Sequence, residues 1–263
     1  MPSDISRQPV TLAGLLSRPP GEGAFPAAVL MHGCGGLLTP SGAVVSRFRD
    51  WAELISAAGY VVLLVDSFNP RGIAQECTLS PQPISPTLDR PGDARGALAY
   101  LQQQTFVDAG RIALIGWSNG GASTLATIVG PLSDGAPAVT TLAGAPWFAA
   151  AMAFYPGCLV ASRASRVASS APLLILQGEA DDWTPAEPCR RLVERAADSP
   201  CPIELQLYPG AYHDFDAPDT PVRVRTDVPR AAATGGVHLG TDPDARADAL
   251  TRVPAFLARY LGV

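Results

Sequence analysis

The sequence of 263 residues contains no lysine, so all 19 of its basic residues are arginines. Acidic residues number 24, and the formal net charge at pH 7 is −5. A surface that binds nucleic acid needs clustered positive charge to neutralise phosphates, and this charge balance argues against one. We attribute the exclusive use of arginine to genome composition rather than to function, and we expect no nucleic-acid partner.

Long apolar runs are missing as well. None approaches the roughly 18 residues that a membrane-spanning helix needs, so we expect no membrane partner. The first ten residues, MPSDISRQPV, lack the basic start and apolar stretch of a secretory signal. The sequence therefore predicts a cytoplasmic protein, or a periplasmic or secreted one if a signal was removed from the natural precursor.

Cysteine and histidine are both scarce. The five cysteines form no CxxC pair, so neither a metal site nor a redox motif is indicated, and we expect no cofactor. Their odd number leaves at least one thiol free, and a disulfide between two of the later cysteines is open. Only three histidines occur, His32, His213 and His238, so a catalytic histidine must be one of them.

Apolar runs alternate with helical patterns along the chain. Strands in a parallel sheet covered on both faces are typically continuously apolar. This pattern fits most of the apolar runs, which occupy residues 27–33, 60–66, 111–117, 151–157, 172–178 and 203–210. Helical patterns occupy residues 43–58, 90–104, 119–130, 186–197 and 243–261. We predict an α/β fold in one domain over residues 1–263, with a mostly parallel twisted central sheet flanked by helices. The segment VTLAG, residues 10–14, could add an edge strand.

Two long segments are poor in regular structure, residues 69–92 and 216–245. Long loops are uncommon in a compact domain unless they serve a functional site. We therefore expect them to lie near the site and to cover part of it; whether they move is open.

The stretch GWSNGG, residues 116–121, places Ser118 between a predicted strand and a predicted helix. Glycines two residues before and after the serine permit the tight turn of a nucleophile elbow, at the strand ends where α/β proteins bind ligands. A glycine-rich helix cap is the alternative interpretation. The elbow predicts Ser118 as a nucleophile.

A serine nucleophile needs a base and an acid that orients the base. In this type of fold both follow the serine, each just past a strand. Asp181 and Asp182 follow the strand predicted at 172–178, and we favour Asp181 for catalysis and Asp182 for the first turn of the next helix. His213 follows the last predicted strand and is the predicted base.

Donors for a developing oxyanion are predicted from two backbone N–H groups. Asn119 follows the serine, and Cys34 lies in MHGCGG after the first central strand. Cys34 has no basic sequence neighbour that would make its thiol a nucleophile. His32 is expected to hydrogen-bond this loop, and His238 is expected to be a loop residue that packs or faces solvent.

The motifs MHGCGGL, VLLVDSFNPRG, GWSNGG, YPGC, GEADDWTP and YPGAYHDFD occur in this order. Together they resemble the dienelactone hydrolase-like family of the α/β-hydrolase superfamily. The resemblance implies an α/β-hydrolase fold, with Ser118, Asp181 and His213 as catalytic triad. It further implies a carboxylic ester hydrolase that acts on a small ester or lactone without a cofactor, as a monomer or homodimer.

This sequence departs from the family pattern at the site. Many dienelactone hydrolases carry a cysteine where Ser118 stands, a glutamate where Gly33 stands, and a pair of arginines for the substrate carboxylate. Here only Arg71 lies near an expected arginine position, with different spacing. A serine favours a general esterase, and Arg71 either binds a substrate carboxylate or pairs with a nearby acid.

Aromatic residues beside the predicted triad could line an acyl pocket, although large aromatics more often pack in the core. The candidates are Trp117, Trp147, Phe148, Trp183 and Tyr212. Beside the esterase, the sequence leaves open a lactone hydrolase selective for a carboxylate-bearing substrate, a peptidase or acyltransferase, and a non-catalytic binding protein on the same scaffold.

Overall fold

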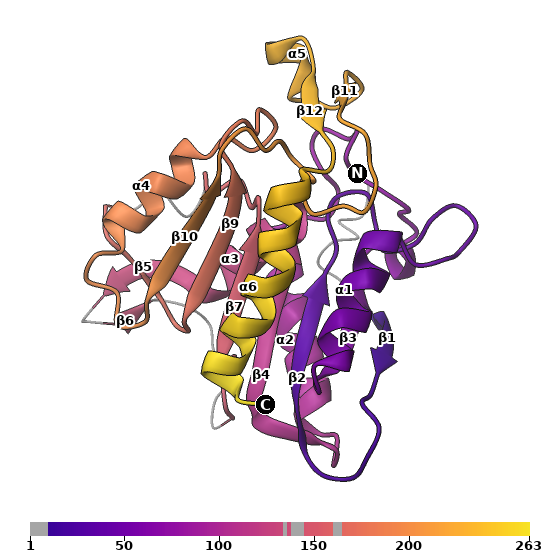
Figure 1. The fold of residues 1–263 in the computed structure, drawn as a ribbon, viewed down its shortest axis with the longest axis vertical. Coiled ribbons are helices and arrows are strands. Elements are labelled where there is room, and N and C mark those ends of the chain that lie inside the picture. The colour runs from indigo at the N-terminus through magenta and orange to yellow at the C-terminus, as the bar shows by residue number, and fades with distance from the viewer. Residues whose placement is uncertain (1–9, 134–135, 138–144, 160–164) are drawn as a thin grey trace, which may run out of the picture.

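A computed structural model describes residues 10–133, 136–137, 145–159 and 165–263 (Figure 1). The first nine residues, on which most of the interpretation of the N-terminus rests, lie outside this part. Within it, no helix is both long enough and apolar enough to cross a membrane.

The centre of the molecule is a seven-stranded sheet with the order β1-β3-β2-β4-β7-β9-β10. Its strands are β1 (Ala13–Ser17), β2 (Phe25–Met31), β3 (Val61–Asp66), β4 (Val107–Trp117), β7 (Ala150–Phe154), β9 (Leu173–Gly178) and β10 (Ile203–Tyr208). Only β1 runs antiparallel, along β3, and the other pairings are parallel. The predicted edge strand exists, but it begins three residues later than the segment VTLAG.

Helices cover both faces of this sheet, as the apolar runs predict. They are α1 (Ser46–Ala57), α2 (Arg90–Gln102), α3 (Asn119–Ile128), α4 (Glu187–Arg195) and α6 (Pro243–Leu261). Alternate residues of β2 enter two different cores: Ala28 and Leu30 pack with α1 and α6, while Val29 and Met31 pack with α2, α3 and α4. Figure 1 shows α1 and α6 together on the near face.

Smaller elements surround the sheet. The structure adds two short sheets that the periodicity does not reveal, made of β5 (Val129–Ser133), β6 (Ala136–Pro137) and β8 (Val167–Ser169), and of β11 (Arg223–Arg225) and β12 (Val237–Leu239). The helix predicted over 119–130 ends at Ile128, because the chain becomes extended at Val129 to pair with β8.

The predicted long loops also contain structure. A short 3₁₀ helix, η2 (Asn69–Arg71), lies in the first, and β11, β12 and α5 (Ala231–Thr234) lie in the second. The second segment projects beyond the sheet at the top of Figure 1. Leu239 of β12 bridges to His213, which lies in the loop after β10.

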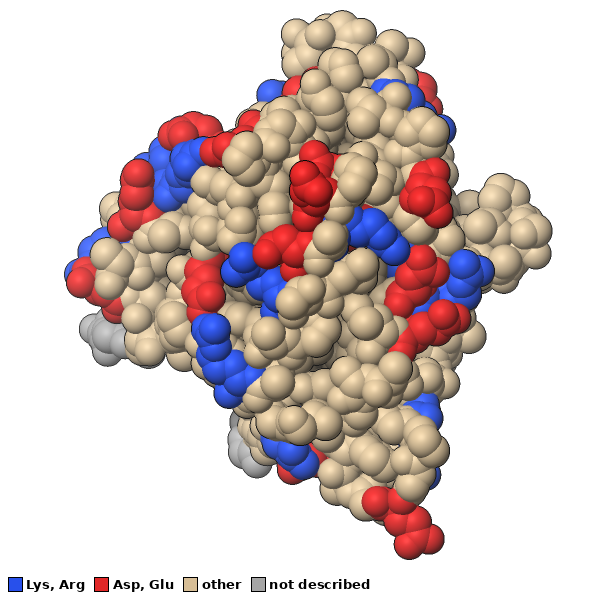
Figure 2. Space-filling view, viewed as in Figure 1, with Lys and Arg blue, Asp and Glu red and all other residues tan. Residues whose placement is uncertain are grey.

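Charged side chains on the near face are mixed in sign. Figure 2 shows arginines and acidic residues interspersed over α1, α6 and the neighbouring strands, without a broad area of one sign.

Candidate active site

Ser118 lies in a sharp turn between β4 and α3. Its backbone has φ 52° and ψ −114°, a left-handed conformation that a non-glycine residue rarely adopts. The flanking glycines make the turn possible: a Cβ on Gly116 would come within 2.1 Å of the Gly120 carbonyl oxygen, and a Cβ on Gly120 within 2.1 Å of the Met31 carbonyl oxygen. The turn leaves Ser118 only partly buried, at the carboxyl end of the sheet.

The structure brings Ser118, His213 and Asp181 into one hydrogen-bonded row. The Ser118 hydroxyl lies 3.0 Å from His213 Nε2, and His213 Nδ1 lies 2.8 Å from Asp181 Oδ2. Because a carboxylate only accepts, Nδ1–H donates to Asp181 and Nε2 is left to accept from the serine. Asp181 is fixed in turn by the N–H groups of Trp183 and Thr184, both bound to its Oδ1.

The surroundings tune His213 as a base. Burial lowers the pKa of its imidazole, but the Asp181 and Asp214 carboxylates together outweigh burial and raise the pKa above the usual value. The Arg47 guanidinium opposes this rise. Arg47 also binds Asp214 at 2.7 Å. A base with a raised pKa holds more tightly the proton that it takes from a serine.

Asp182, predicted in the first turn of a helix, has a different partner. Its carboxylate accepts from the His238 backbone N–H and lies 2.7 Å from His238 Nδ1. The residue before α4 is Ala186, which makes no side-chain cap. The expectation for Asp182 is therefore wrong, because β12 approaches this loop and supplies a stronger partner. His238, expected in a loop, is instead the middle residue of β12, and its ring stacks on Tyr212 with the centroids 4.8 Å apart.

The two predicted oxyanion donors flank Ser118. The N–H of Asn119 belongs to the first turn of α3, where amides have no partner within the helix. Cys34 lies in the loop after β2, and within the described residues its N–H makes no backbone hydrogen bond. His32 holds this loop as predicted: its Nδ1 lies 2.7 Å from the Gly33 carbonyl oxygen, and its Nε2 accepts from the Ser67 N–H.

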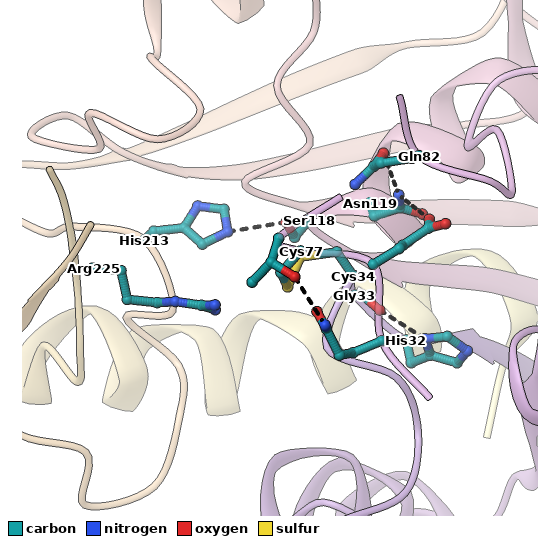
Figure 3. The surroundings of a disulfide bond; sticks show 12 residues. His32, Gly33, Cys34, Cys77, Gln82, Ser118, Asn119, His213 and Arg225 are labelled. Carbon is teal, nitrogen blue, oxygen red and sulfur yellow. Dashed lines mark hydrogen bonds between the residues drawn. A yellow bond between two sulfur atoms is a disulfide. The ribbon is translucent and has the colours of Figure 1, made fainter. Parts of the chain in front are cut away.

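The Cys34 side chain is bonded to Cys77 in a disulfide at the edge of the site (Figure 3). Cys34 therefore has no free thiol that could act as a nucleophile. A second disulfide joins Cys158 to Cys189 under α4, and Cys201 is a free thiol. The sequence predicted a free thiol and left open a pair among the later cysteines, but it gave no signal for the Cys34–Cys77 pair.

Two cavities meet at Ser118. The larger, about 370 Å³, extends past Asn119, and its further lining includes Ala122, Pro156 and Leu159. The smaller, about 150 Å³, is the one lined by His213. Cys34, Cys77 and Trp183 border both cavities. Trp183 therefore lies where the sequence placed it, and its ring centroid is 4.8 Å from that of His213.

Three predicted substrate contacts are wrong. Trp117 is fully buried, stacked on Phe154 at 5.0 Å, because it is the last residue of a central strand and faces the core. Arg71 forms a two-point ion pair with Asp93 at 2.8 and 2.9 Å, which settles the alternative in favour of pairing. Tyr212 stacks on His238 and lines neither of the two cavities.

The residues that line the smaller cavity include three arginines that sequence reasoning missed, Arg47, Arg223 and Arg225. Arg225 lies over the Trp183 ring at 5.4 Å, and Figure 3 shows its side chain directed toward the disulfide. The alternating RVR at residues 223–225 places two arginines on one face of an extended segment, but nothing in the sequence indicates that this segment lies near Ser118. Among the described residues, no cluster of His, Cys, Asp or Glu could hold a metal ion.

A parallel sheet with a strained serine turn at its carboxyl edge, and an acid and histidine supplied by later loops, is the arrangement of an α/β-hydrolase. The profile of the dienelactone hydrolase family matches residues 12–261, and the chain belongs to that family.

Similar proteins agree with this assignment. A probable 2-oxo-3-(5-oxofuran-2-ylidene)propanoate lactonase from Bradyrhizobium sp is 27% identical over 219 residues, which cover 81% of this chain and 82% of that protein. The propionate-bound structure of the esterase Est2 from Thermogutta terrifontis superposes with a TM-score of 0.66 at 20% identity and covers 97% of this chain and 91% of that one. The same enzyme, phosphoramylated by tabun, gives a TM-score of 0.67 at 18% identity, with the same coverage. The chain is a hydrolase of carboxylic esters or lactones.

Proposed function

We propose that the protein hydrolyses carboxylic esters through an acyl-enzyme on Ser118. The observation that carries the proposal is the row from Ser118 through His213 to Asp181, with contacts of 3.0 and 2.8 Å. Such a row gives a weak hydroxyl nucleophile the base and the orienting acid that it needs.

The reaction follows from the row. Ser118 Oγ attacks the ester carbonyl carbon while its proton passes to His213 Nε2. The carbonyl oxygen becomes an oxyanion that accepts from the N–H groups of Cys34 and Asn119, each donor being worth about 2.7–4 kcal/mol in comparable sites. The imidazolium then protonates the departing alcohol. Water, deprotonated by the same histidine, attacks the acyl-enzyme and releases the acid and the serine.

The two cavities divide the substrate between them. Because the proton donor for the leaving alcohol is His213, we assign the alcohol to the smaller cavity, which that residue lines. The acyl group then takes the larger cavity, past Asn119 and Ala122. A volume of about 370 Å³, with walls that include Leu79, Pro156 and Leu159, supports a short or medium acyl chain.

Turnover of p-nitrophenyl esters, from acetyl to a long acyl chain, tests the proposal. The wild type should hydrolyse the short esters, and Ser118→Ala should lose all but a trace of that activity while its far-UV circular dichroism is unchanged. Ser123→Ala is the matched control, because Ser123 lies in α3 and its hydroxyl donates to the Asn119 carbonyl oxygen within the helix, away from the row at Ser118. Activity retained in Ser118→Ala would refute the proposal.

A second candidate is a lactone hydrolase for a carboxylate-bearing substrate, and the arginines of the smaller cavity favour it. Arg223 and Arg225 belong to β11 and face the same space as His213. The Bradyrhizobium relative is named for a lactone that carries a carboxylate. In Arg223→Gln/Arg225→Gln, KM should rise for a dienelactone carboxylate and stay unchanged for a neutral lactone. Arg252→Gln, a partly exposed arginine of α6, is the control.

Two disulfides support the periplasmic or secreted location rather than the cytoplasmic one. Disulfides persist in oxidising compartments and are rare in the cytosol. We infer that the chain works where Cys34–Cys77 and Cys158–Cys189 stay oxidised. Fractionation of the producing cell tests the inference, and activity confined to the cytosol would contradict it.

A further inference from the structure

A buried segment of two residues touches both of the proposed oxyanion donors. The Glu76 N–H donates to the Cys34 carbonyl oxygen at 2.8 Å, and the next residue, Cys77, is bonded to the Cys34 sulfur. The Glu76 carboxylate reaches the other donor residue, because its Oε1 accepts from Asn119 Nδ2 at 3.0 Å. One residue therefore contacts both the loop after β2 and the first residue of α3.

The Asn119 amide is held at both ends by groups of opposite charge. Its oxygen accepts from Arg90 Nη1 at 2.5 Å, and its nitrogen donates to Glu76 and to the Gln82 side-chain oxygen. A cation at the acceptor end and an anion at the donor end fix the orientation of the amide, because a flipped amide would oppose both charges. Figure 3 shows Asn119 and Gln82 on the side of Ser118 away from His213.

Glu76 is fully buried, and it lines neither cavity at Ser118. Its second oxygen accepts from the Ile84 N–H at 3.1 Å. A buried carboxylate costs free energy unless such bonds compensate it, and no substrate atom can reach it here. A role in the reaction must therefore pass through the groups that it holds.

We propose that Glu76 is a positioning residue for the oxyanion hole: its N–H orients the peptide at Cys34, and its carboxylate orients Asn119. Arg90 is its counterpart at the far end of the Asn119 side chain. This inference rests on the proposed function, since it takes the two backbone N–H groups to bind the oxyanion.

A purely structural role makes a different prediction from a positioning role. Oxyanion contacts act in the transition state, so misplaced donors lower kcat and leave KM unchanged. Misplaced donors also lower the affinity for a trifluoromethyl ketone inhibitor by the same factor, because its adduct with Ser118 carries an oxyanion. A structural role lowers stability without either effect.

The experiment compares Glu76→Ala and Glu76→Gln with the wild type, using kcat, KM, the trifluoromethyl ketone inhibition constant and Tm. Glu76→Ala keeps the backbone N–H at Cys34 and removes the carboxylate at Asn119. Loss of a whole donor costs about 100–1,000-fold in kcat, so displacement of the Asn119 donor should cost about 10–100-fold. Glu76→Gln keeps an oxygen for Asn119 but turns an N–H₂ group toward the Ile84 N–H, and it should cost about 3–10-fold. Asp248→Asn is the control, because the Asp248 carboxylate bonds to Tyr208 and to Arg252 of α6 instead.

Each outcome bears on the inference. A fall in kcat with unchanged KM, matched by the rise in the ketone inhibition constant and absent in Asp248→Asn, supports it. A kcat within twofold of wild type in both Glu76 variants, or a rise in KM alone, overturns it. If Glu76→Ala does not fold, Glu76→Gln alone decides. A wild type that turns over no ester counts against the proposed function, and the ketone affinities then still decide the role of Glu76.

Discussion

The Asp216 carboxylate is buried at the centre of the core behind the serine turn, and its removal should be among the most destabilising single changes in this chain. Its Oδ2 accepts from the indole N–H groups of Trp51 and Trp117, each at 2.8 Å. Its Oδ1 accepts from the Tyr155 hydroxyl at 2.6 Å. No part of the Asp216 residue is exposed.

The number of donors sets the magnitude of the loss. Asp216→Ala leaves two buried indole N–H groups without a partner and the Tyr155 hydroxyl, which still accepts from Arg47, without an acceptor for its proton. Each unmade bond costs about 1–3 kcal/mol, or about 3–9 kcal/mol together. That is comparable to the whole free energy of unfolding of an ordinary domain, about 5–15 kcal/mol. We expect Asp216→Ala to be largely unfolded at 25 °C.

Asp216→Asn should be much milder. The amide oxygen can keep both indole contacts, and the amide nitrogen can donate to Tyr155, whose hydroxyl is able to accept. What is lost is the charge, which makes a hydrogen bond worth about 1.5–3 kcal/mol instead of about 0.5–1.5. The attraction to Arg47 Nε, 3.7 Å from Oδ1, is lost as well. We expect a loss of about 1–3 kcal/mol.

Urea unfolding followed by far-UV circular dichroism measures both changes. Asp198→Ala is the control, because that side chain is 68% exposed and its ion pair with Arg166 should contribute under about 1 kcal/mol. If Asp216→Ala and Asp216→Asn lose equal amounts, both below about 1 kcal/mol, the donors have found other partners and the reasoning fails.

Two further predictions concern activity. Asp214→Asn removes an anion that raises the pKa of His213 and leaves Arg47 to lower it, so the acid limb of the kcat/KM profile should move to lower pH; an unmoved limb would contradict the electrostatic account. Replacing both Cys34 and Cys77 by serine should lower kcat by a larger factor than it changes KM, because Cys34 contributes a proposed oxyanion donor. The same exchange at the disulfide under α4 should cost stability, about 2–4 kcal/mol, without a change in kcat.

The sheet and the row at Ser118 could be predicted because their signals are local. Most central strands contain a continuous apolar run, and the glycines around Ser118 fix a turn that few sequences permit. The order of acid and histidine then leaves few candidates in a chain with three histidines. Asp181 was separable from Asp182 only by its spacing from the strand.

The walls of the site could not be predicted in the same way. Arg225 reaches the cavity from a hairpin about a hundred residues beyond the serine, and its neighbours in sequence are those of an ordinary exposed loop. Arg71 lies near an arginine position of the family pattern, but it forms an ion pair with Asp93 of α2 and does not reach the site. Partners of this kind depend on how loops fold back over the sheet, which periodicity does not encode.

The four tryptophans occupy three distinct surroundings, so intrinsic fluorescence can report on the core and on the active site separately. Trp51 and Trp117 share one carboxylate in the core, so their emission should be blue-shifted in the native state and move to longer wavelength only on unfolding. Trp183 lies against the His213 ring, and a protonated imidazole quenches indole emission on contact. In a Trp147→Phe variant, the quenching of Trp183 emission measured as a function of pH would report the protonation of His213 directly, without substrate or turnover.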